Sequence, residues 1–373
     1  MMSALQAFAS WSVYGIPGFL FLITVVVFFH ELGHFSVARF FGVRIETFSI
    51  GFGPAIVKWK DKHGTLWKIS WLPLGGYVKF FGDADAASTP DREAAARMNA
   101  ADRSIAYPFK PLYQRALITV AGPVANFILA VVILTGLFMF QGVLIVPPIV
   151  AAVTPHSAAD AAGIHVGDRI VSIDGENVAG YDDIHAIVAL SAGRSLPIVL
   201  DRSGHELTVL ATPRNTADTD QFGNKSMIGR LGVGAPPVKG FTRLGPVQAV
   251  GAAFKEIQQI IVTTYRALTR SPEGTKQLSG IIGIAKISGQ VAAVSFIALI
   301  HLAALLSVSI GLVNLFPIPL LDGGHLLYYA CEGVLGRPLG ERAQDVGFRL
   351  GLAVVLGIFL LATWNDLVRL NLF

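Results

Sequence analysis

The chain has 373 residues, of which 53% are hydrophobic and only 14% are charged. Soluble globular proteins carry about 25% charged residues, so this composition argues against a purely soluble protein. The 29 Lys and Arg against 25 Asp and Glu leave a formal charge of +4, spread along the chain, so nucleic acid is not an expected partner. A single cysteine, Cys331, excludes an internal disulfide framework and a cysteine-rich zinc site.

Four apolar segments are long enough to cross a bilayer, which takes about 20 mostly apolar residues. They lie at 15–41, 116–140, 294–316 and 346–364. The first segment could be taken for a signal peptide, but residues 1–38 contain no Lys or Arg. Because a signal peptide needs a basic n-region, we expect the first segment to be retained as a membrane span.

The loops predict the orientation of these spans. Residues 41–115 hold eleven Lys and Arg against seven acids, and cytoplasmic loops are enriched in Lys and Arg. This loop is therefore expected in the cytoplasm, and residues 141–290 and both termini outside it. The first and third spans then run in the same direction.

Outside the membrane, residues 147–213 are predicted to form a small α/β domain, since short β-branched runs alternate with turn signals. The expected strands are at 149–153, 169–173, 196–200 and 206–211, with a helix at 181–191. Residues 214–240 are predicted to be a linker with one further strand. A helix over about 246–270 carries one apolar stripe, and either the membrane interface or the protein itself could cover that stripe.

The cytoplasmic loop contains a second structured segment. Residues 67–80, WKISWLPLGGYVKF, alternate apolar and polar side chains around Gly75 and Gly76. This pattern predicts a membrane-associated β-hairpin within the segment. Residues 83–106 show no clear period, and no structure is predicted for them.

The first span contains the motif HELGH, with His30 and His34 one helical turn apart and Glu31 beside them. Two imidazoles at this spacing can hold one Zn²⁺ and leave the carboxylate free to act on water bound to the metal. A charged side chain at the centre of a membrane helix costs about 2.5–3.5 kcal/mol or more, so such residues are seldom kept without a function. The alternative is a buried polar network that braces the helices.

A third ligand is needed, and the end of the third span provides candidates. This segment reads NLFPIPLLDGGH, and Asp322 follows a span that is broken by Pro317 and Pro319. Broken backbone at membrane depth is tolerated where it lines a water-filled cavity, which hydrolysis requires. Asp322 is therefore the expected third ligand, with His325 and His301 as competitors.

Two further features have alternative interpretations. Asn314 could cap the backbone freed by the prolines or bind the backbone of an extended substrate. On the second span, Gly122, Pro123 and Asn126 indicate close helix packing with one interhelical hydrogen bond.

Together, HELGH, the Gly-Gly-Tyr segment and NLFPIPLLDGG resemble the site-2 protease family of intramembrane zinc metalloproteases, peptidase family M50. The segment SAADAAGIHVGDRIVSIDGENV at 157–178 is similar to a bacterial PDZ domain. The resemblance implies Zn²⁺ bound by His30, His34 and Asp322, with Glu31 as the catalytic base. Substrate contacts are implied for Asn314, Pro317 and the segment with Gly75, Gly76 and Tyr77.

The expected fold is a multi-pass α-helical membrane protein with four transmembrane helices, an inserted PDZ-like domain and a β-hairpin. Its domains are 1–140 with the first two spans, 147–213 as the PDZ-like domain, 214–290 as linker and amphipathic helix, and 291–373 with the last two spans. The resemblance places it in a bacterial inner membrane, with the PDZ-like domain in the periplasm and the active site toward the cytoplasm.

Single-span membrane proteins are the implied substrates, for example anti-sigma factors or remnant signal peptides. Only one PDZ-like repeat is present, and Ile281 stands where such proteins usually carry proline. No Gly-rich loop precedes the first strand of that domain, so it could act as a steric lid or as a peptide reader. The alternative functions are a PDZ-bearing scaffold, a zinc transporter and a metalloprotease whose site lies outside the bilayer.

Overall fold

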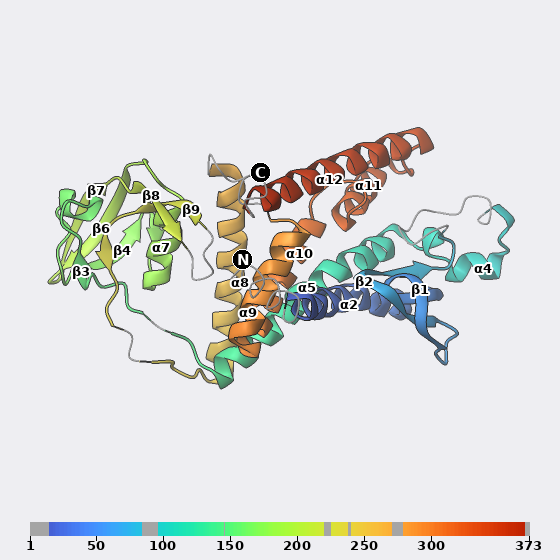
Figure 1. Cartoon of the computed structure of the whole chain (residues 1–373). Helices are drawn as coiled ribbons and strands as arrows, with labels where there is room; N and C mark the ends of the chain where they lie inside the picture. The colour runs from blue at the N-terminus through green and yellow to red at the C-terminus, as the bar shows by residue number, and fades with distance from the viewer. Residues whose placement is uncertain are drawn as a thin grey trace. The chain divides into compact units, whose positions relative to one another are not determined.

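The computed structural model describes residues 15–83, 96–144, 146–219, 225–237, 240–270 and 279–369 (Figure 1). The chain forms two compact units. The first unit is built from Met1–Thr135, Ala253–Ile261 and Ser279–Phe373, and the second from Gly136–Ala252 and Val262–Leu278.

Among the described residues, four helices are long and apolar enough to cross a membrane. They are α2 (Ile16–Phe40), α5 (Leu112–Phe140), α10 (Phe296–Asn314) and α12 (Glu341–Arg369), whose apolar part covers Arg342–Val368. These helices match the four predicted apolar segments in place and length, with ends that differ by about one helical turn at most. The first unit also contains the short helices α4 (Ala100–Ile105), η2 (Tyr107–Phe109), α9 (Ile281–Val294) and α11 (Asp322–Leu335). No structure was predicted for residues 83–106, but the helix α4 forms within this range. Asn99 caps its N-terminus.

The helix α9 is fixed at its start by a carboxylate from α12. Asp366, which is buried, accepts hydrogen bonds from the backbone N–H groups of Gly280 and Gly283 at 3.0 and 2.8 Å. An acidic side chain at a helix N-terminus satisfies N–H groups that have no partner within the helix. Ile281 is the first residue of α9, a position where proline's missing N–H would cost nothing. Isoleucine in place of the usual proline is therefore compatible with the same helix start.

The strands β1 (Ile45–Lys60) and β2 (Leu66–Phe80) form an antiparallel pair against α2. Both strands bend, so each contributes two extended arms. The β2 arm at 66–69 pairs on one side with 57–60 and on the other with 47–50, whereas the arm at 76–80 pairs with 45–50. The predicted hairpin within 67–80 is therefore wrong. Its two halves lie on opposite sides of the first β1 arm, and the turn that joins the strands is at 61–65.

The predicted hairpin failed because the first β1 arm inserts between the two halves of β2. Phe48 of that arm is fully buried and stacks on Trp67 with the ring centroids 4.3 Å apart. Phe35 of α2 packs edge-on against both rings. A local alternation pattern does not reveal such a partner, which comes from a separate part of the chain.

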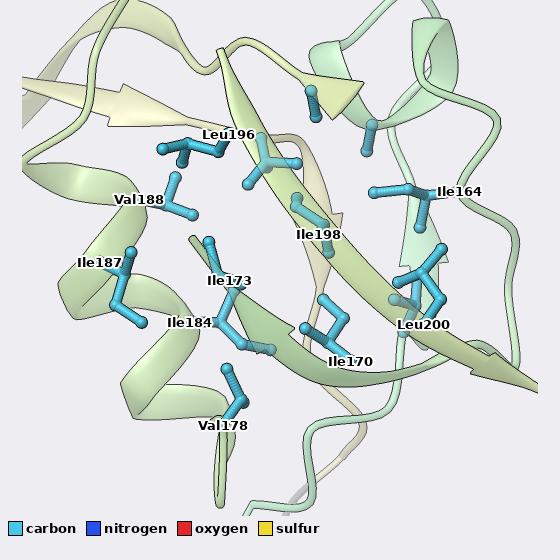
Figure 2. Packing of buried hydrophobic residues seen from close by; sticks show 14 residues of the cluster. Ile164, Ile170, Ile173, Val178, Ile184, Ile187, Val188, Leu196, Ile198 and Leu200 are labelled. Atoms are coloured by element: carbon cyan, nitrogen blue, oxygen red, sulfur yellow. The ribbon is translucent and has the colours of Figure 1, made fainter. Parts of the chain in front are cut away.

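The second unit has a four-stranded sheet with the order β5-β4-β6-β7. Its strands are β4 (Arg169–Ile173), β5 (Glu176–Asn177), β6 (Leu196–Arg202) and β7 (His205–Ala211), and the helices α6 (Ala158–Ala161) and α7 (Tyr181–Ala189) accompany them. Figure 2 shows how Ile170, Ile173 and Ile198 of the sheet point toward Ile184 of α7. Alternating side chains of β6 are buried, as expected for a strand with one face on a core.

Residues 214–240 contain more structure than the predicted linker with one strand. The strands β8 (Arg214–Thr219) and β9 (Lys225–Arg230) pair with each other, and β10 (Val233–Gly234) pairs with β3 (Ala152–Val153). The chain thus returns to the start of the domain, where Tyr181 donates a hydrogen bond to the carbonyl of Val233 at 2.7 Å. The helix α8 covers Pro246–Arg270.

Candidate metal centre

Three possible metal ligands converge in the first unit. The Nε2 atoms of His30 and His34 lie 3.2 Å apart, and Asp322 Oδ2 lies 3.2 Å from the first and 3.5 Å from the second. Both histidines are buried. Among the described residues, these three form the one group of His, Cys, Asp or Glu side chains that could hold a metal ion.

The spacing of the three atoms fits zinc. Ligand atoms about 2.0–2.2 Å from a tetrahedral Zn²⁺ lie about 3.3–3.6 Å from one another. The three distances of 3.2, 3.2 and 3.5 Å are close to the edges of such a tetrahedron. Apart from the two histidines, this buried Asp322 Oδ2 meets no hydrogen-bond partner among the described residues, as expected of an atom that binds a cation. Two imidazoles and one carboxylate are a donor set of catalytic zinc sites, which keep a fourth position open.

The histidines reach this position because α2 and α5 approach each other closely. A Cβ atom on Gly33 would come within 2.3 Å of the Ala121 carbonyl oxygen, and one on Gly122 would come within 2.2 Å of His34 Nε2. A larger residue at either position would therefore collide with α5 or with His34, so both positions need glycine. On the far side of its ring, His34 Nδ1 donates a hydrogen bond to the Ile118 carbonyl at 2.8 Å.

Asp322 is positioned by the broken chain between α10 and α11. Pro317 and Pro319 prevent α10 from continuing, and Leu320 takes a positive φ of 93°. The turn brings Asp322 to the first position of α11. A Cβ atom on Gly323 would lie 2.2 Å from the Phe316 carbonyl oxygen, and one on Gly324 would lie 2.4 Å from that of Ile318. The two glycines of LDGG thus let the start of α11 pack directly on the turn.

Glu31 lies between the histidines and the sheet. The backbone of Val78 in β2 hydrogen-bonds to the Glu31 carboxylate. Gly76 permits this contact, because a Cβ atom there would lie 2.7 Å from the Ser49 carbonyl oxygen and 3.3 Å from Glu31 Cγ. The second arm of β2 is therefore in direct contact with the helix that carries the metal ligands.

The residues with implied substrate contacts lie at different distances from this centre. Asn314, the last residue of α10, has its amide nitrogen 3.4 Å from His30 Nε2. Gly76 touches Glu31, whereas Gly75 and Tyr77 on either side pack on Phe52. Pro317 is exposed in the turn that precedes Asp322.

The two competing ligands do not join the group. His301 pairs with Glu256 of α8, with Nε2 and Oε1 2.8 Å apart. His325 lies one turn after Asp322 on α11, and its ring meets Tyr328 edge-on. Asp322 is thus the third candidate metal ligand, next to His30 and His34.

Sequence reasoning did not connect α5 with the metal centre. Gly122, Pro123 and Asn126 were expected to pack helices closely and to form one interhelical hydrogen bond. In the structure the Asn126 side chain lies at hydrogen-bond distance, 3.2 Å, from His30 Nδ1, and Gly122 leaves room for His34, so both expected features involve the histidines. The sequence signal was present in AGPVANFILA, where one asparagine stands in an otherwise apolar segment.

Comparisons with known proteins show which family the chain belongs to. The model of peptidase family M50 matches residues 18–358. The chain belongs to peptidase family M50. A protein of Agrobacterium fabrum, named as a candidate zinc metalloprotease, is 43% identical over 99% of this chain and 100% of its own length. The metalloprotease MmpA of Caulobacter vibrioides is 41% identical over 95% of each chain.

This M50 member is a membrane protein and a zinc metalloprotease. The resemblance that HELGH and NLFPIPLLDGG suggested is thereby confirmed, as is zinc as the cofactor. A candidate zinc metalloprotease of Rickettsia conorii is still 32% identical over 95% of this chain and 99% of its own length.

Proposed function

We propose that this zinc metalloprotease hydrolyses peptide bonds within, or at the edge of, the transmembrane segments of other membrane proteins. One observation carries the proposal: His30, Glu31 and His34 lie on α2, a helix long and apolar enough to cross a membrane. A protease that acts on soluble substrates would not need its zinc motif inside such a helix.

His30, His34 and Asp322 are the zinc ligands in this proposal. A zinc ion held by these residues would supply Lewis-acid chemistry that polarises the scissile carbonyl and makes water more acidic. Glu31, adjacent to His30 in the chain, takes a proton from the attacking water and gives it to the leaving amine. The hydrogen bond from Val78 and the packing of Gly76 hold this carboxylate on the side of the ligands that faces the sheet.

The substrate binds in an extended form. A transmembrane helix hides its peptide bonds in its own hydrogen bonds, so it must unwind before hydrolysis. Among the described strands, the 76–80 arm of β2 pairs only with 45–50 of β1, which leaves its other edge for a substrate strand. Gly75, Gly76 and Tyr77 form the start of that edge, next to Glu31, and Asn314 and Pro317 contact the substrate from the α10–α11 turn.

The substrates are single-span membrane proteins, and anti-sigma factors and remnant signal peptides are the two classes that the family suggests. The orientation follows from the eleven basic residues between the first two spans, which favour the cytoplasm. Both termini and the second unit then face the periplasm of a bacterial inner membrane. The second unit contains the PDZ-like domain at 147–213, which acts as a steric lid and excludes substrates not yet trimmed outside.

The proposal is tested with the full chain in liposomes and a reporter that has one transmembrane segment. The native protein is expected to cut the reporter, and Glu31→Gln to lose at least about 100-fold in rate while it keeps its zinc, because general acid–base catalysis contributes about 10²–10⁴-fold. Equal cleavage by both proteins would overturn the assignment of Glu31. Failure of the native protein to cut any membrane-embedded reporter would overturn the proposed substrate class.

A further inference from the structure

Asn126 is a fully buried polar side chain beside the metal centre. It is 0% exposed, and its amide nitrogen lies 3.2 Å from His30 Nδ1, on the ring edge opposite the Nε2 atom that faces Asp322. Its Oδ1 atom has no hydrogen-bond partner in the part of the chain that the structure describes. A buried amide that is half satisfied costs free energy, so its place next to a ligand needs an explanation.

The two histidines differ in the group that meets their Nδ1 atoms. His34 Nδ1 faces the carbonyl of Ile118, which can only accept a hydrogen bond. That contact places the proton of His34 on Nδ1 and leaves the lone pair of Nε2 for a metal. Among the described residues, no backbone carbonyl takes this role for His30, and the side chain of Asn126 stands in that place.

The amide of Asn126 can meet His30 in two orientations. If Nδ2 donates to Nδ1, the proton of the neutral ring must sit on Nε2, where it would block the metal. If the amide turns over, Oδ1 accepts from Nδ1–H and the lone pair of Nε2 faces the ligand group. The nitrogen and oxygen of an asparagine amide have nearly the same shape, so the surrounding packing allows either orientation.

We propose that Asn126 is a positioning residue that selects the metal-binding tautomer of His30 by accepting the Nδ1 proton through Oδ1. This inference rests on the proposed ligand set. With Asn126 in this role, each histidine donates its Nδ1 proton to an oxygen atom of α5. Histidines that bind metals usually make such a hydrogen bond with their other ring nitrogen. The acceptors lie eight residues apart on α5, at Ile118 and Asn126, opposite histidines four residues apart on α2.

The surroundings hold Asn126 in place for this role. Ser307 of α10 donates a hydrogen bond to its backbone carbonyl at 2.8 Å. A Cβ atom on Gly311, also in α10, would come within 3.3 Å of Asn126 Cβ. The residue is therefore fixed between α10 and the ring of His30, and it has little freedom to move away from the ligand.

The test compares two substitutions of nearly equal size in the full detergent-solubilised chain. Asn126→Asp keeps an oxygen acceptor, whereas Asn126→Leu removes it. Zinc affinity is measured by competition with a chelator, and the visible spectrum of the Co²⁺-substituted protein reports the ligand geometry. Removing such an acceptor costs about 10–100-fold in metal affinity, so Asn126→Leu is expected to fall by that factor and to change the Co²⁺ spectrum. Asn126→Asp is expected to stay within about threefold of the native protein.

The control Thr135→Val removes another buried polar atom of α5 and is expected to leave zinc affinity unchanged. Native affinity in Asn126→Leu would overturn the inference, and so would a loss in Asn126→Asp as large as that in Asn126→Leu. Failure of the ligand set itself is recognised separately, because His30→Ala would then bind zinc as the native chain does.

Discussion

The two units fill their interiors with different residues. The second unit buries branched aliphatic side chains from β4, β6 and α7 around Ile173 and Ile198 (Figure 2). Around the metal centre of the first unit, glycines bring backbones together, and buried polar side chains occupy the space between α2, α5 and α11. The difference is physical: in water apolar burial drives packing, whereas within lipid close contact and polar pairing hold helices together.

The comparison predicts that one added methyl group does most damage where a glycine faces a ligand. Gly122→Ala would drive a Cβ atom into the ring of His34, so we expect zinc affinity to fall at least about 100-fold and proteolysis to be lost. The matched control is Gly136→Ala on the same helix, where a Cβ atom meets nothing within 4 Å. Chelator competition on both variants checks this, and native zinc affinity in Gly122→Ala would contradict the account.

In the second unit the largest effect should come from deleting core volume. Ile173→Ala removes a fully buried side chain and is expected to destabilise this unit by about 2–5 kcal/mol. Leu210→Ala, at a position that is 68% exposed, is the control with little effect. Hydrogen exchange followed by mass spectrometry on the full chain measures the stability of the unit. The proposed difference between the two units would be contradicted if Ile173→Ala lowered zinc affinity as much as Gly122→Ala does.

A smaller effect is expected from the ion pair that ties α5 to α11. Arg115 donates to both carboxylate oxygens of Glu332 at 2.5 and 3.2 Å, and its guanidinium lies 5.0 Å from the ring centre of Tyr329. Since hydrogen bonds between charged groups contribute about 1.5–3 kcal/mol, Glu332→Gln should destabilise the first unit by that amount. A double-mutant cycle with Arg115→Gln should give a clear coupling energy, and additive effects would show that the pair contributes nothing.

The smallest effect concerns pH and the second unit. Arg202 donates two hydrogen bonds of 2.8 Å to Asp168 and thereby lowers the pKa of this buried carboxyl below its ordinary value. The stability that the pair provides is complete above the unfolded-state pKa of about 3.9. It is lost as the pH falls through the lower pKa of the folded state. Between pH 6 and pH 3, hydrogen exchange should show that the second unit loses stability more steeply in the native chain than in Asp168→Asn. Equal pH dependence in the two proteins would show that the pair does not contribute to stability.

The sequence predicted those features that are written in one continuous stretch. The spans follow from unbroken apolar runs, and HELGH has a spacing that a single helix turns into one face. The partner of β2 was missed because the β1 arm around Phe48 comes from elsewhere in the chain. The interhelical hydrogen bond expected of Asn126 was predicted without its partner for the same reason, since only the placement of α5 against α2 brings Asn126 to His30.

Asp322 could be predicted despite its distance from HELGH in the chain. It is an acidic residue beside two prolines at the end of an apolar segment, and each of these signals is local. The sequence favoured Asp322 and kept His301 and His325 as competing ligands. The structure separates them by direct contacts, since His301 pairs with Glu256 and Asp322 meets both histidines.

The position of the cut in the reporter tests the central claim most directly. The full chain in liposomes is incubated with a single-span reporter, and the new termini are identified by mass spectrometry. A zinc site built on α2 and completed at the α10–α11 turn predicts a cut inside the apolar segment or at its edge, and none by Glu31→Gln. A cut confined to the polar flanks, far from the apolar segment, would contradict proteolysis within the membrane.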